Sequence, residues 1–375
     1  MELDDGGFHV LLVGEGDLSH GAFVRRIAEG LRRRAGVTTE THVIDAPRGP
    51  WARLIAPFPR LGDLDLQPLR WRLRYSWHAR RALDAPADVA LVNTQSVALL
   101  AGKPMRRTPT VLSVDLTGRQ FAALEYWRRR GRTAPVSELP LEALERRALQ
   151  RAARVLAWTE WTAHSLREDY GLPSEQIAVI HPGVDIARWS VERVAPPASP
   201  ERLRILFVGN HARRKGLRTL LSALPLVERP FELHVVSNDA QLDVPDDVVV
   251  HRGLAPGSEG LKRQLAEADV FVLPTRADGA PWAILEAMAA GLPVVASDVA
   301  AIPELVGDAG VVVPPGDPVV LAAALRALAD DPDRRAALGA RARARACEHY
   351  AQEHQLDRIL DVLRTAYERP LGAVA

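Results

Sequence analysis

Residues 270–297 read VFVLPTRADGAPWAILEAMAAGLPVVAS, and this stretch carries the signals of a strand, a loop, a helix and a second strand. Residues 270–273 form an apolar run typical of a buried strand, and Pro281 follows at a position suited to the first residue of a helix. Gly291 is placed just beyond the end of that helix, and Pro293 starts the next apolar run. The order strand, helix, strand predicts two parallel strands with the helix packed against their sheet.

The same alternation extends over the whole chain. Strands are expected at residues 9–13, 37–44, 87–93, 110–114, 154–157, 203–208, 231–236, 248–251, 270–273, 293–296 and 310–313. Helices are expected at residues 20–34, 138–153, 217–226, 261–268, 281–290, 318–328, 332–349 and 353–367. Alternating strands and helices predict an α/β protein whose parallel sheets are covered by helices on both faces.

The length of the chain, 375 residues, suits two domains better than one. Residues 193–202 contain three prolines and little apolar surface, which is typical of a linker. We therefore expect an N-terminal domain over residues 1–192 and a C-terminal domain over residues 203–350. Each is expected to be a doubly wound, Rossmann-like parallel sheet. Ligands of such sheets bind at the carboxyl ends of the strands, so the two domains are expected to face a binding cleft.

The composition excludes several classes of protein. Hydrophobic residues make up 47% and charged residues 25% of the chain, which is typical of a globular protein. No apolar stretch approaches the ~20 residues of a membrane-spanning helix, and the acidic N-terminus differs from a secretion signal. The single cysteine, Cys347, excludes an intramolecular disulfide and a metal site with several cysteines. We expect a soluble, cytoplasmic protein.

Positive charge is concentrated in the first half, where residues 1–195 hold 28 Arg and Lys against 23 Asp and Glu. Five arginines and no acidic residue lie between Asp65 and Asp84, at positions 70, 72, 74, 80 and 81. This segment is interpreted either as a solvated helix whose long side chains cover apolar surface or as a surface for an anionic acceptor or lipid headgroups. The second interpretation would place the protein at the inner face of the membrane. An overall pI near 8 disfavours nucleic acid as the partner.

The helix expected at 281–290 is a candidate anion site. Its first residues present free backbone N–H groups near Ala280 to Ala283. Asp278 precedes this helix and Glu286 lies inside it, so both can flank an anion bound at the helix start. The alternative is that Asp278 is a capping-region acid and Glu286 an ordinary surface residue.

Residues 205–216, ILFVGNHARRKG, again read as a strand, a glycine turn and the start of a helix. Lys215 is one of only three lysines among 48 basic residues, which indicates a site that needs a compact ammonium group. Positive charge at a helix N-terminus is unfavourable unless an anion binds there. The alternative is a solvated basic turn.

These segments resemble the family 4 retaining glycosyltransferases of the GT-B fold. The family carries an acid, seven residues and a second acid, matched here by Asp278-x7-Glu286, followed by AMAAGLPVV at 287–295. Further similar stretches lie at 158–165, 180–185, 302–306 and 313–317. The resemblance covers nearly the whole chain and is most specific in its C-terminal half.

The resemblance implies roles for the residues of the C-terminal domain. Glu286 would hold the ribose of a nucleoside-diphosphate sugar, Asp278 the hydroxyls of the transferred sugar, and Lys215 the diphosphate, with Arg214 as the second cation. The donor site would be completed by Gly209, Asn210, Ala280, Pro281 and Trp282. No metal and no cofactor besides this co-substrate are expected, since the cations take the place of a metal.

For the N-terminal domain, the resemblance implies an acceptor side with Gly16, Asp115 and Thr117 as candidates. The last helix, about 353–375, would cross back to this domain. Three departures from the family pattern stand out. Many members have Glu where Asp278 stands, Asn210 replaces the usual arginine, and SVDLT at 113–117 replaces a segment that frequently contains His.

The expected function is transfer of a sugar, with retention, from a nucleoside-diphosphate sugar to a hydroxyl of a glycan, lipid or small molecule. Two alternatives stay open: another GT-B enzyme such as a sugar-nucleotide epimerase or phosphorylase, and a binding module without activity. The glycine turn at 13–16 is too loose for a dinucleotide fingerprint and is interpreted as a tight turn that an acceptor can approach.

Overall fold

The computed structural model describes residues 7–16, 20–45, 60–61, 64–65, 67–124, 134–191 and 202–368. These residues belong to two compact units. Unit 1 comprises Met1–Ala123, Arg128–Ile180 and Gln355–Ala375, and unit 2 comprises Leu124–Trp127 and His181–His354. Each unit is built around one parallel sheet.

The sheet of unit 1 has six parallel strands in the order β2-β1-β5-β6-β7-β8. Their bounds are β1 Phe8–Glu15, β2 Val37–Ile44, β5 Val89–Asn93, β6 Thr110–Val114, β7 Arg154–Ala157 and β8 Ile177–Val179. A separate antiparallel pair is formed by β3 Arg60–Leu61 and β4 Leu64–Asp65. The central strands are continuous buried apolar runs, as expected for a sheet with helices on both faces.

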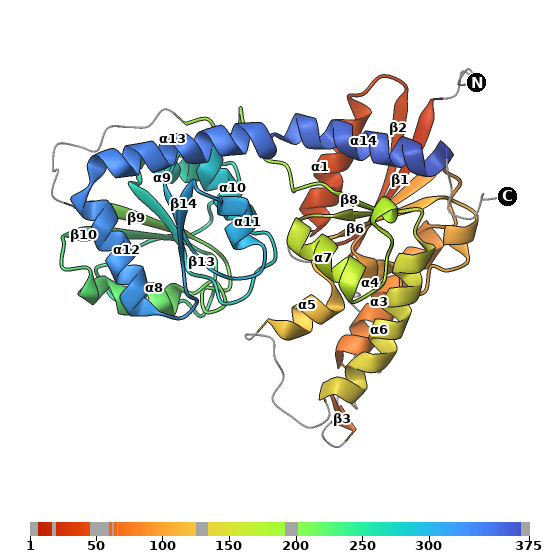
Figure 1. Cartoon of the computed structure of the whole chain (residues 1–375), viewed down its shortest axis with the longest axis horizontal. Coiled ribbons are helices and arrows are strands. Elements are labelled where there is room, and N and C mark those ends of the chain that lie inside the picture. The colour runs from red at the N-terminus through yellow and green to blue at the C-terminus, as the bar shows by residue number, and fades with distance from the viewer. Residues whose placement is uncertain are drawn as a thin grey trace. The chain divides into compact units, whose positions relative to one another are not determined.

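Helices cover both faces of the unit 1 sheet (Figure 1). They are α1 His20–Arg32, α3 Gln67–Ala82, α4 Gln95–Ala98, α5 Gly118–Ala123, α6 Ala134–Arg151, α7 Glu160–Glu168 and α14 Gln352–Glu368, with short 3₁₀ turns η1 Pro104–Arg106 and η2 Ser174–Gln176. The C-terminal helix α14 packs on α1. A side chain at Gly30 would collide with Leu356, and Arg34 Nε donates to Asp357 Oδ1 at 2.9 Å.

The sheet of unit 2 also has six parallel strands, in the order β11-β10-β9-β12-β13-β14. Their bounds are β9 Leu203–Val208, β10 Phe231–Val236, β11 Val249–His251, β12 Val270–Leu273, β13 Val294–Ser297 and β14 Gly310–Val313. The helices are α8 Leu217–Ala223, α9 Glu259–Glu267, α10 Trp282–Ala289, α11 Ile302–Val306, α12 Pro318–Asp330 and α13 Pro332–His349, and the 3₁₀ turn η3 Leu224–Leu226 extends α8.

Both sheets are doubly wound, which confirms the predicted fold class. In unit 1 the chain moves outward from β1 to β2 and then returns to the other side of β1 with β5. In unit 2 it moves from β9 to β10 and β11 and returns with β12. The topological switch points therefore lie between β1 and β5 and between β9 and β12, and ligands of such sheets bind at these points.

The boundary between the units lies before the predicted linker. Most of that linker, residues 193–201, is outside the described residues. The preceding segment, 181–191, belongs to unit 2 and not to the first domain. The reason is local: Val184 forms a parallel bridge with Ala351, and His181 Nε2 lies 2.9 Å from Glu304 Oε1 of α11.

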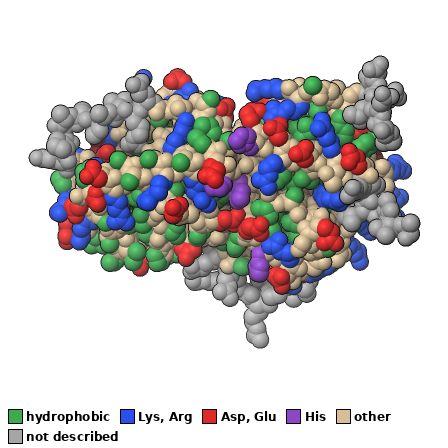
Figure 2. Space-filling model, turned by 45° about the horizontal axis from the view of Figure 1, so that its top comes forward, with side chains coloured by type: hydrophobic (Ala, Val, Ile, Leu, Met, Phe, Trp, Pro, Cys, Tyr) green, Lys and Arg blue, Asp and Glu red, His purple; other side chains and the backbone are tan. Residues whose placement is uncertain are grey.

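The surface carries both signs of charge. On the face shown in Figure 2, basic and acidic side chains are interspersed, in keeping with a net charge of +1 for the whole chain. In the part of the chain that is described, no helix combines the length and the apolar character needed to cross a membrane.

Candidate active site

The glycine turn after β9 brings Lys215 to the switch point of unit 2. Gly209 donates its backbone N–H to Val236 O at 3.0 Å, which ties the turn to the end of β10. A Cβ at Gly209 would lie 3.0 Å from Lys215 Cγ, so the absence of a side chain lets the lysine stem pass close to the turn. The sequence therefore needs glycine at this position to place the ammonium group.

A second glycine joins this turn to the end of β12. Gly216 precedes α8 with φ +84°, and a Cβ there would lie 1.8 Å from Pro274 O. Both the conformation and the close approach require glycine. Two further hydrogen bonds fix the same contact, because Arg276 N–H and Thr275 Oγ1 both donate to Arg214 O, at 2.9 and 3.1 Å. The loops after β9 and β12 thus form one rigid unit.

Three charged side chains meet where these loops join. Lys215 Nζ forms an ion pair with Asp278 Oδ2, and Arg214 Nη1 lies 3.3 Å from the same oxygen. Arg214 Nη1 also donates to Ala277 O at 2.6 Å. The side chains of Arg214, Lys215 and Asp278 are 14%, 13% and 15% exposed. Two cations share one carboxylate, so the cluster has a net charge of +1 in a largely desolvated place.

The structure gives Asp278 contacts in addition to the role expected from the resemblance. The family resemblance implies that Asp278 contacts the hydroxyls of a transferred sugar. In the structure its Oδ2 holds both Lys215 and Arg214, so the carboxylate fixes the two cations and neutralises one of their charges. Arg214 and Lys215 thus contact the same carboxylate oxygen.

Helix α10 begins directly after this cluster. Pro281 is the N-cap, with φ −72° and ψ 117°, and Trp282 is the first helical residue, so the prediction of Pro281 as the first residue was wrong by one position. The reason is that Pro281 keeps an extended ψ and offers its carbonyl to Ile284 N–H at 3.1 Å. Ala280 and Pro281 are buried, whereas Trp282 and Glu286, one turn apart, lie on the partly exposed side of the helix.

Asn210 is bound to a neighbouring loop of unit 2. Its Oδ1 accepts the backbone N–H of Asn238 at 2.8 Å, which fixes the loop after β10. Asp239 in that loop accepts Ala212 N–H at 2.9 Å, and its hydrogen bonds from the backbone N–H groups of Gln241 and Ala212 hold the pKa of the carboxyl below its usual value. Sequence analysis did not identify Asp239, which shapes the turn that carries Lys215.

In unit 1, three strands end at the same level, because Gly14 pairs with Asn93 and Asn93 pairs with Ser113. Gly16 follows the first of these strands and donates its N–H to Ile44 O at 2.8 Å, and a Cβ at this position would lie 2.5 Å from Asp45 Oδ1. Packing against the loop after β2 therefore explains this glycine, in contrast to the expected approach of an acceptor.

The two other acceptor-side candidates differ in exposure. The side chain of Asp115 is 21% exposed, and its Oδ2 lies 3.8 Å from His20 Nε2. Thr117 is fully buried, and its hydroxyl is hydrogen-bonded to Ser165 Oγ at 2.8 Å. A buried hydroxyl with an internal partner does not reach an acceptor, so the prediction for Thr117 was wrong and its role is to fix the start of α5.

Comparison with known proteins accounts for both units. Residues 21–188 match the family described as Glycosyltransferase Family 4, and residues 202–331 match that described as Glycosyl transferases group 1. The chain belongs to the family 4 glycosyltransferases. Residues 1–20, 189–201 and 332–375 lie outside the two matched regions.

The sequences of several relatives match part of this chain. The colanic acid biosynthesis glycosyltransferase WcaL of Escherichia coli is 36% identical over 220 residues, which are 52% of each chain. D-inositol 3-phosphate glycosyltransferase 1 of Catenulispora acidiphila is 30% identical over 270 residues, which are 64% of this chain and 63% of that protein. The chain thus matches about half the length of WcaL and somewhat more of the second relative.

Solved structures share the GT-B fold. Sucrose-phosphate synthase from Thermosynechococcus elongatus superposes with a TM-score of 0.75 at 19% identity, over 96% of this chain and 99% of that chain. Anabaena Alr3699/HepE, solved in complex with UDP and glucose, superposes with a TM-score of 0.68 at 18% identity, over 96% and 100% of the two chains. At these identities the likeness shows the fold.

A buried carboxylate fixes the loop after β6 in this family member. Glu145 of α6 accepts Gly118 N–H at 2.9 Å, Gln95 Nε2 at 2.9 Å and the Tyr170 hydroxyl at 2.8 Å. A Cβ at Gly118 would lie 2.4 Å from Glu145 Oε2, so glycine is required for this close approach. Burial, and then the negative charge of Glu145, raises the pKa of Tyr170 well above its usual value, which keeps the phenol a hydrogen-bond donor.

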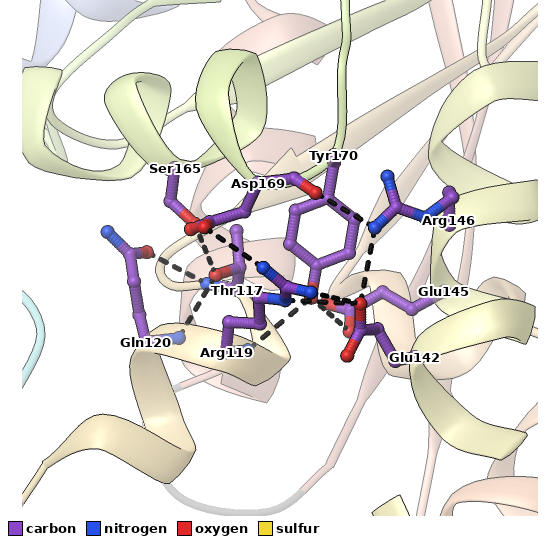
Figure 3. A network of polar contacts seen from close by, with 9 residues as sticks. All are labelled: Thr117, Arg119, Gln120, Glu142, Glu145, Arg146, Ser165, Asp169 and Tyr170. Carbon is purple, nitrogen blue, oxygen red and sulfur yellow. Dashed lines mark hydrogen bonds and ion pairs between the residues drawn. The ribbon is translucent and has the colours of Figure 1, made fainter. Parts of the chain in front are cut away.

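Figure 3 shows that this network continues from α5 to α6 and α7. Thr117 N–H donates to Gln120 Oε1 at 3.0 Å, and Ser165 Oγ donates to Asp169 Oδ2 at 2.6 Å. Arg119 Nη2 lies 2.9 Å from Glu142 Oε1, and Arg119 Nη1 lies 3.3 Å from Asp169 Oδ1. These contacts hold residues 117–120, which begin two residues after Asp115. The ion pairs of Arg119 were not predicted from the sequence because they join residues 23 and 50 positions apart.

Proposed function

We propose that the chain is a retaining glycosyltransferase that moves a sugar from a nucleoside-diphosphate sugar to a hydroxyl acceptor. The observation that carries this proposal is the cluster of Lys215, Arg214 and Asp278 at the switch point of unit 2, beside the start of α10. Its net positive charge and the positive end of the dipole of α10 suit a diphosphate. Family membership and the solved complex of HepE with UDP-glucose support the same ligand class.

The proposed mechanism follows from the position at which negative charge develops during sugar transfer. As the bond between the anomeric carbon and the diphosphate oxygen breaks, charge develops on the leaving oxygen, and Lys215 and Arg214 stabilise it. The acceptor oxygen forms a new bond to the same carbon from the same face, and the hydroxyl proton passes to the leaving diphosphate. Glu286, on the partly exposed side of α10, binds the ribose hydroxyls. The reaction needs no protein-bound metal because the two cations supply the charge.

The acceptor binds to unit 1. The name of WcaL refers to colanic acid biosynthesis, and we take a hydroxyl of a growing glycan as the acceptor class, within carbohydrate biosynthesis. The carboxyl ends of β1, β5 and β6 provide the polar surface for it.

The exposed side of α3 favours contact with the cytoplasmic face of a membrane. Trp77 is 51% exposed, and His78 and Arg81 beside it are exposed as well. An exposed tryptophan among basic side chains suits the headgroup region of anionic lipid. Co-sedimentation with phosphatidylglycerol vesicles should decrease at high salt and in a Trp77→Ala variant, whereas binding that neither change affects would contradict this contact.

The test of the main proposal is a donor panel. UDP-, GDP- and ADP-sugars are incubated with the protein and a mixed set of glycan acceptors in the presence of EDTA, and release of nucleoside diphosphate is measured. Release that depends on acceptor, with a product of unchanged anomeric configuration by NMR, is the expected result. Interconversion of the sugar nucleotides would instead indicate an epimerase, and binding without turnover a binding module. Activity that EDTA abolishes would contradict the metal-independent reaction.

A further inference from the structure

The switch point of unit 1, where the proposed function places the acceptor, holds a polar cluster whose residues have not yet been given a role. It lies between β1 and β5, where Glu15 ends β1, Asn93 ends β5 and His20 starts α1. Asp115 follows β6, the strand next to β5. Because Gly14, Asn93 and Ser113 pair in register across these strands, the side chains gather at one edge of the sheet.

His20 is the centre of this cluster and is held from several sides. Its Nε2 lies 3.8 Å from Asp115 Oδ2, and its Nδ1 lies 3.3 Å from Asn93 Nδ2. The ring packs against Trp158, at 6.2 Å between centroids, and Trp158 is itself fixed by a 2.8 Å hydrogen bond to Ser113 Oγ. The imidazole is 12% exposed. The exposed edge of the His20 ring is accessible to a ligand although the ring is held in place.

Asn93 gives an independent indication of a ligand. It is fully buried, and its Oδ1 has no hydrogen-bond partner among the described residues. A buried amide without its full set of partners is unfavourable and calls for an explanation such as a bound ligand or water. Since an amide can turn either its nitrogen or its oxygen toward His20 Nδ1, Asn93 can support both tautomers of the ring. His20 Nε2 can therefore either donate to a hydroxyl or accept from one.

The charge of the cluster sets the class of ligand. Asp115 and Glu15 contribute two carboxylates, and Ser96 Oγ donates to Glu15 Oε2 at 3.3 Å. Carboxylates accept hydrogen bonds from hydroxyl groups and repel phosphate and carboxylate groups. The cluster thus has the opposite character to the net positive cluster of unit 2.

We propose that Glu15, His20 and Asp115 bind the acceptor through neutral hydroxyl groups and select against an acceptor that carries a phosphate or carboxylate at this position. His20 and the two carboxylates are specificity-determining residues for a sugar or polyol ring. This inference rests on the proposed glycosyltransferase function. It separates the chain from its relatives named D-inositol 3-phosphate glycosyltransferase, whose name contains a phosphorylated compound.

The test compares matched acceptors with the sugar nucleotide that the donor panel identifies. The pairs are glucose and glucose 6-phosphate, mannose and mannose 6-phosphate, and myo-inositol and inositol 3-phosphate. We expect kcat/KM at least tenfold higher for the neutral members. The double variant Glu15→Gln, Asp115→Asn should reduce this preference at least tenfold, because it removes the charge and keeps groups that form hydrogen bonds. His20→Gln should raise KM for neutral acceptors more than it lowers kcat.

Glu29→Gln is the matched control, since Glu29 is an exposed carboxylate on the same helix, α1, and its variant should keep the wild-type preference. Preference for the phosphorylated acceptors, or an unchanged preference in the double variant, would overturn the inference while the proposed function stands. If no sugar nucleotide is turned over, the proposed function fails. Saturation-transfer NMR of the same acceptor pairs on the protein alone then decides the inference by whether the neutral members bind better and lose binding in Asp115→Asn.

Discussion

Replacing Lys215 by alanine tests the cation cluster most directly. The change lowers the net charge of the cluster from +1 to 0, because Arg214 and Asp278 remain and neutralise each other. Coulomb's law gives about 4 kcal/mol for two unit charges 4 Å apart at an effective dielectric of 20. Removing one preorganised donor to a developing oxyanion costs roughly 10²–10³ in rate. The two figures agree, so we expect turnover to fall by about 10²–10³.

The assay is release of nucleoside diphosphate by the wild type and the variant under saturating donor. Arg213→Ala provides the control, since Arg213 lies two positions earlier on the same turn but its side chain is exposed. This variant should keep activity within about twofold of the wild type, because an exposed charge is screened by solvent. Circular dichroism and the urea midpoint establish that both variants fold.

Two results would refute this reasoning. A folded Lys215→Ala enzyme with turnover within threefold of the wild type would show that the ammonium group does not stabilise the leaving group. Equal losses in the Lys215 and Arg213 variants would show that the turn attracts anions only through its total charge, without the specific geometry at Asp278.

Three further predictions concern stability and pH. Gly216→Ala should lower the free energy of unfolding by about 3 kcal/mol in a urea titration, because φ is +84° and the new Cβ would overlap Pro274 O; a loss below 1 kcal/mol would contradict this. Glu145→Ala should cost about 3 kcal/mol, since three buried donors lose their acceptor, and an unchanged urea midpoint would show that the network does not stabilise unit 1. Burial lowers the pKa of both His234 and His251 from 6.5, so the unfolded chain binds more protons below that pH. The free energy of unfolding should therefore fall as the pH decreases from 7 to 5, and fall less in His234→Gln.

The strands could be predicted closely from the sequence, because each central strand is a short apolar run between turn residues. The edge strand β2 coincides with the alternating pattern expected at 37–44, and the apolar runs expected at 110–114, 203–208 and 270–273 coincide with β6, β9 and β12. Parallel sheets with covered faces need such continuous apolar runs, so the local pattern contains the information. The edge strand β8, Ile177–Val179, was not predicted because a run of three apolar residues is too short to be recognised as a strand.

Helix ends were harder to predict because backbone effects of proline act over one or two residues. The helix expected at 217–226 ends at Ala223 and continues as the 3₁₀ turn η3. Pro225 lacks the N–H that an α-helix would need there. At Pro281 the helix begins one residue later than predicted, because the proline serves as the cap.

The contacts between distant residues of the site could not be predicted from the sequence. Motif resemblance identified Lys215, Arg214 and Asp278 individually. The ion pairs of Asp278 with residues 63 and 64 positions earlier in the chain were not predictable from spacing. His20 was not identified either, since its significance depends on Asn93 and Asp115, which the sheet brings together from distant segments. The sequence therefore indicates which residues belong to a site more readily than it indicates which distant residues they contact.

The contacts of Asn210 and Arg214 also indicate how the chain accommodates Asn210 in place of the family's usual arginine. Asn210 Oδ1 accepts the N–H of Asn238, a bond that an arginine, which has no acceptor, could not make. We propose that Arg214, whose guanidinium lies 3.3 Å from the Asp278 oxygen that Lys215 also contacts, supplies the missing positive charge. The turn therefore keeps two cations while gaining a fixed loop after β10. If this is correct, Asn210→Arg should lower stability without raising turnover, whereas a variant that is both stable and faster would show that Arg214 is not the replacement.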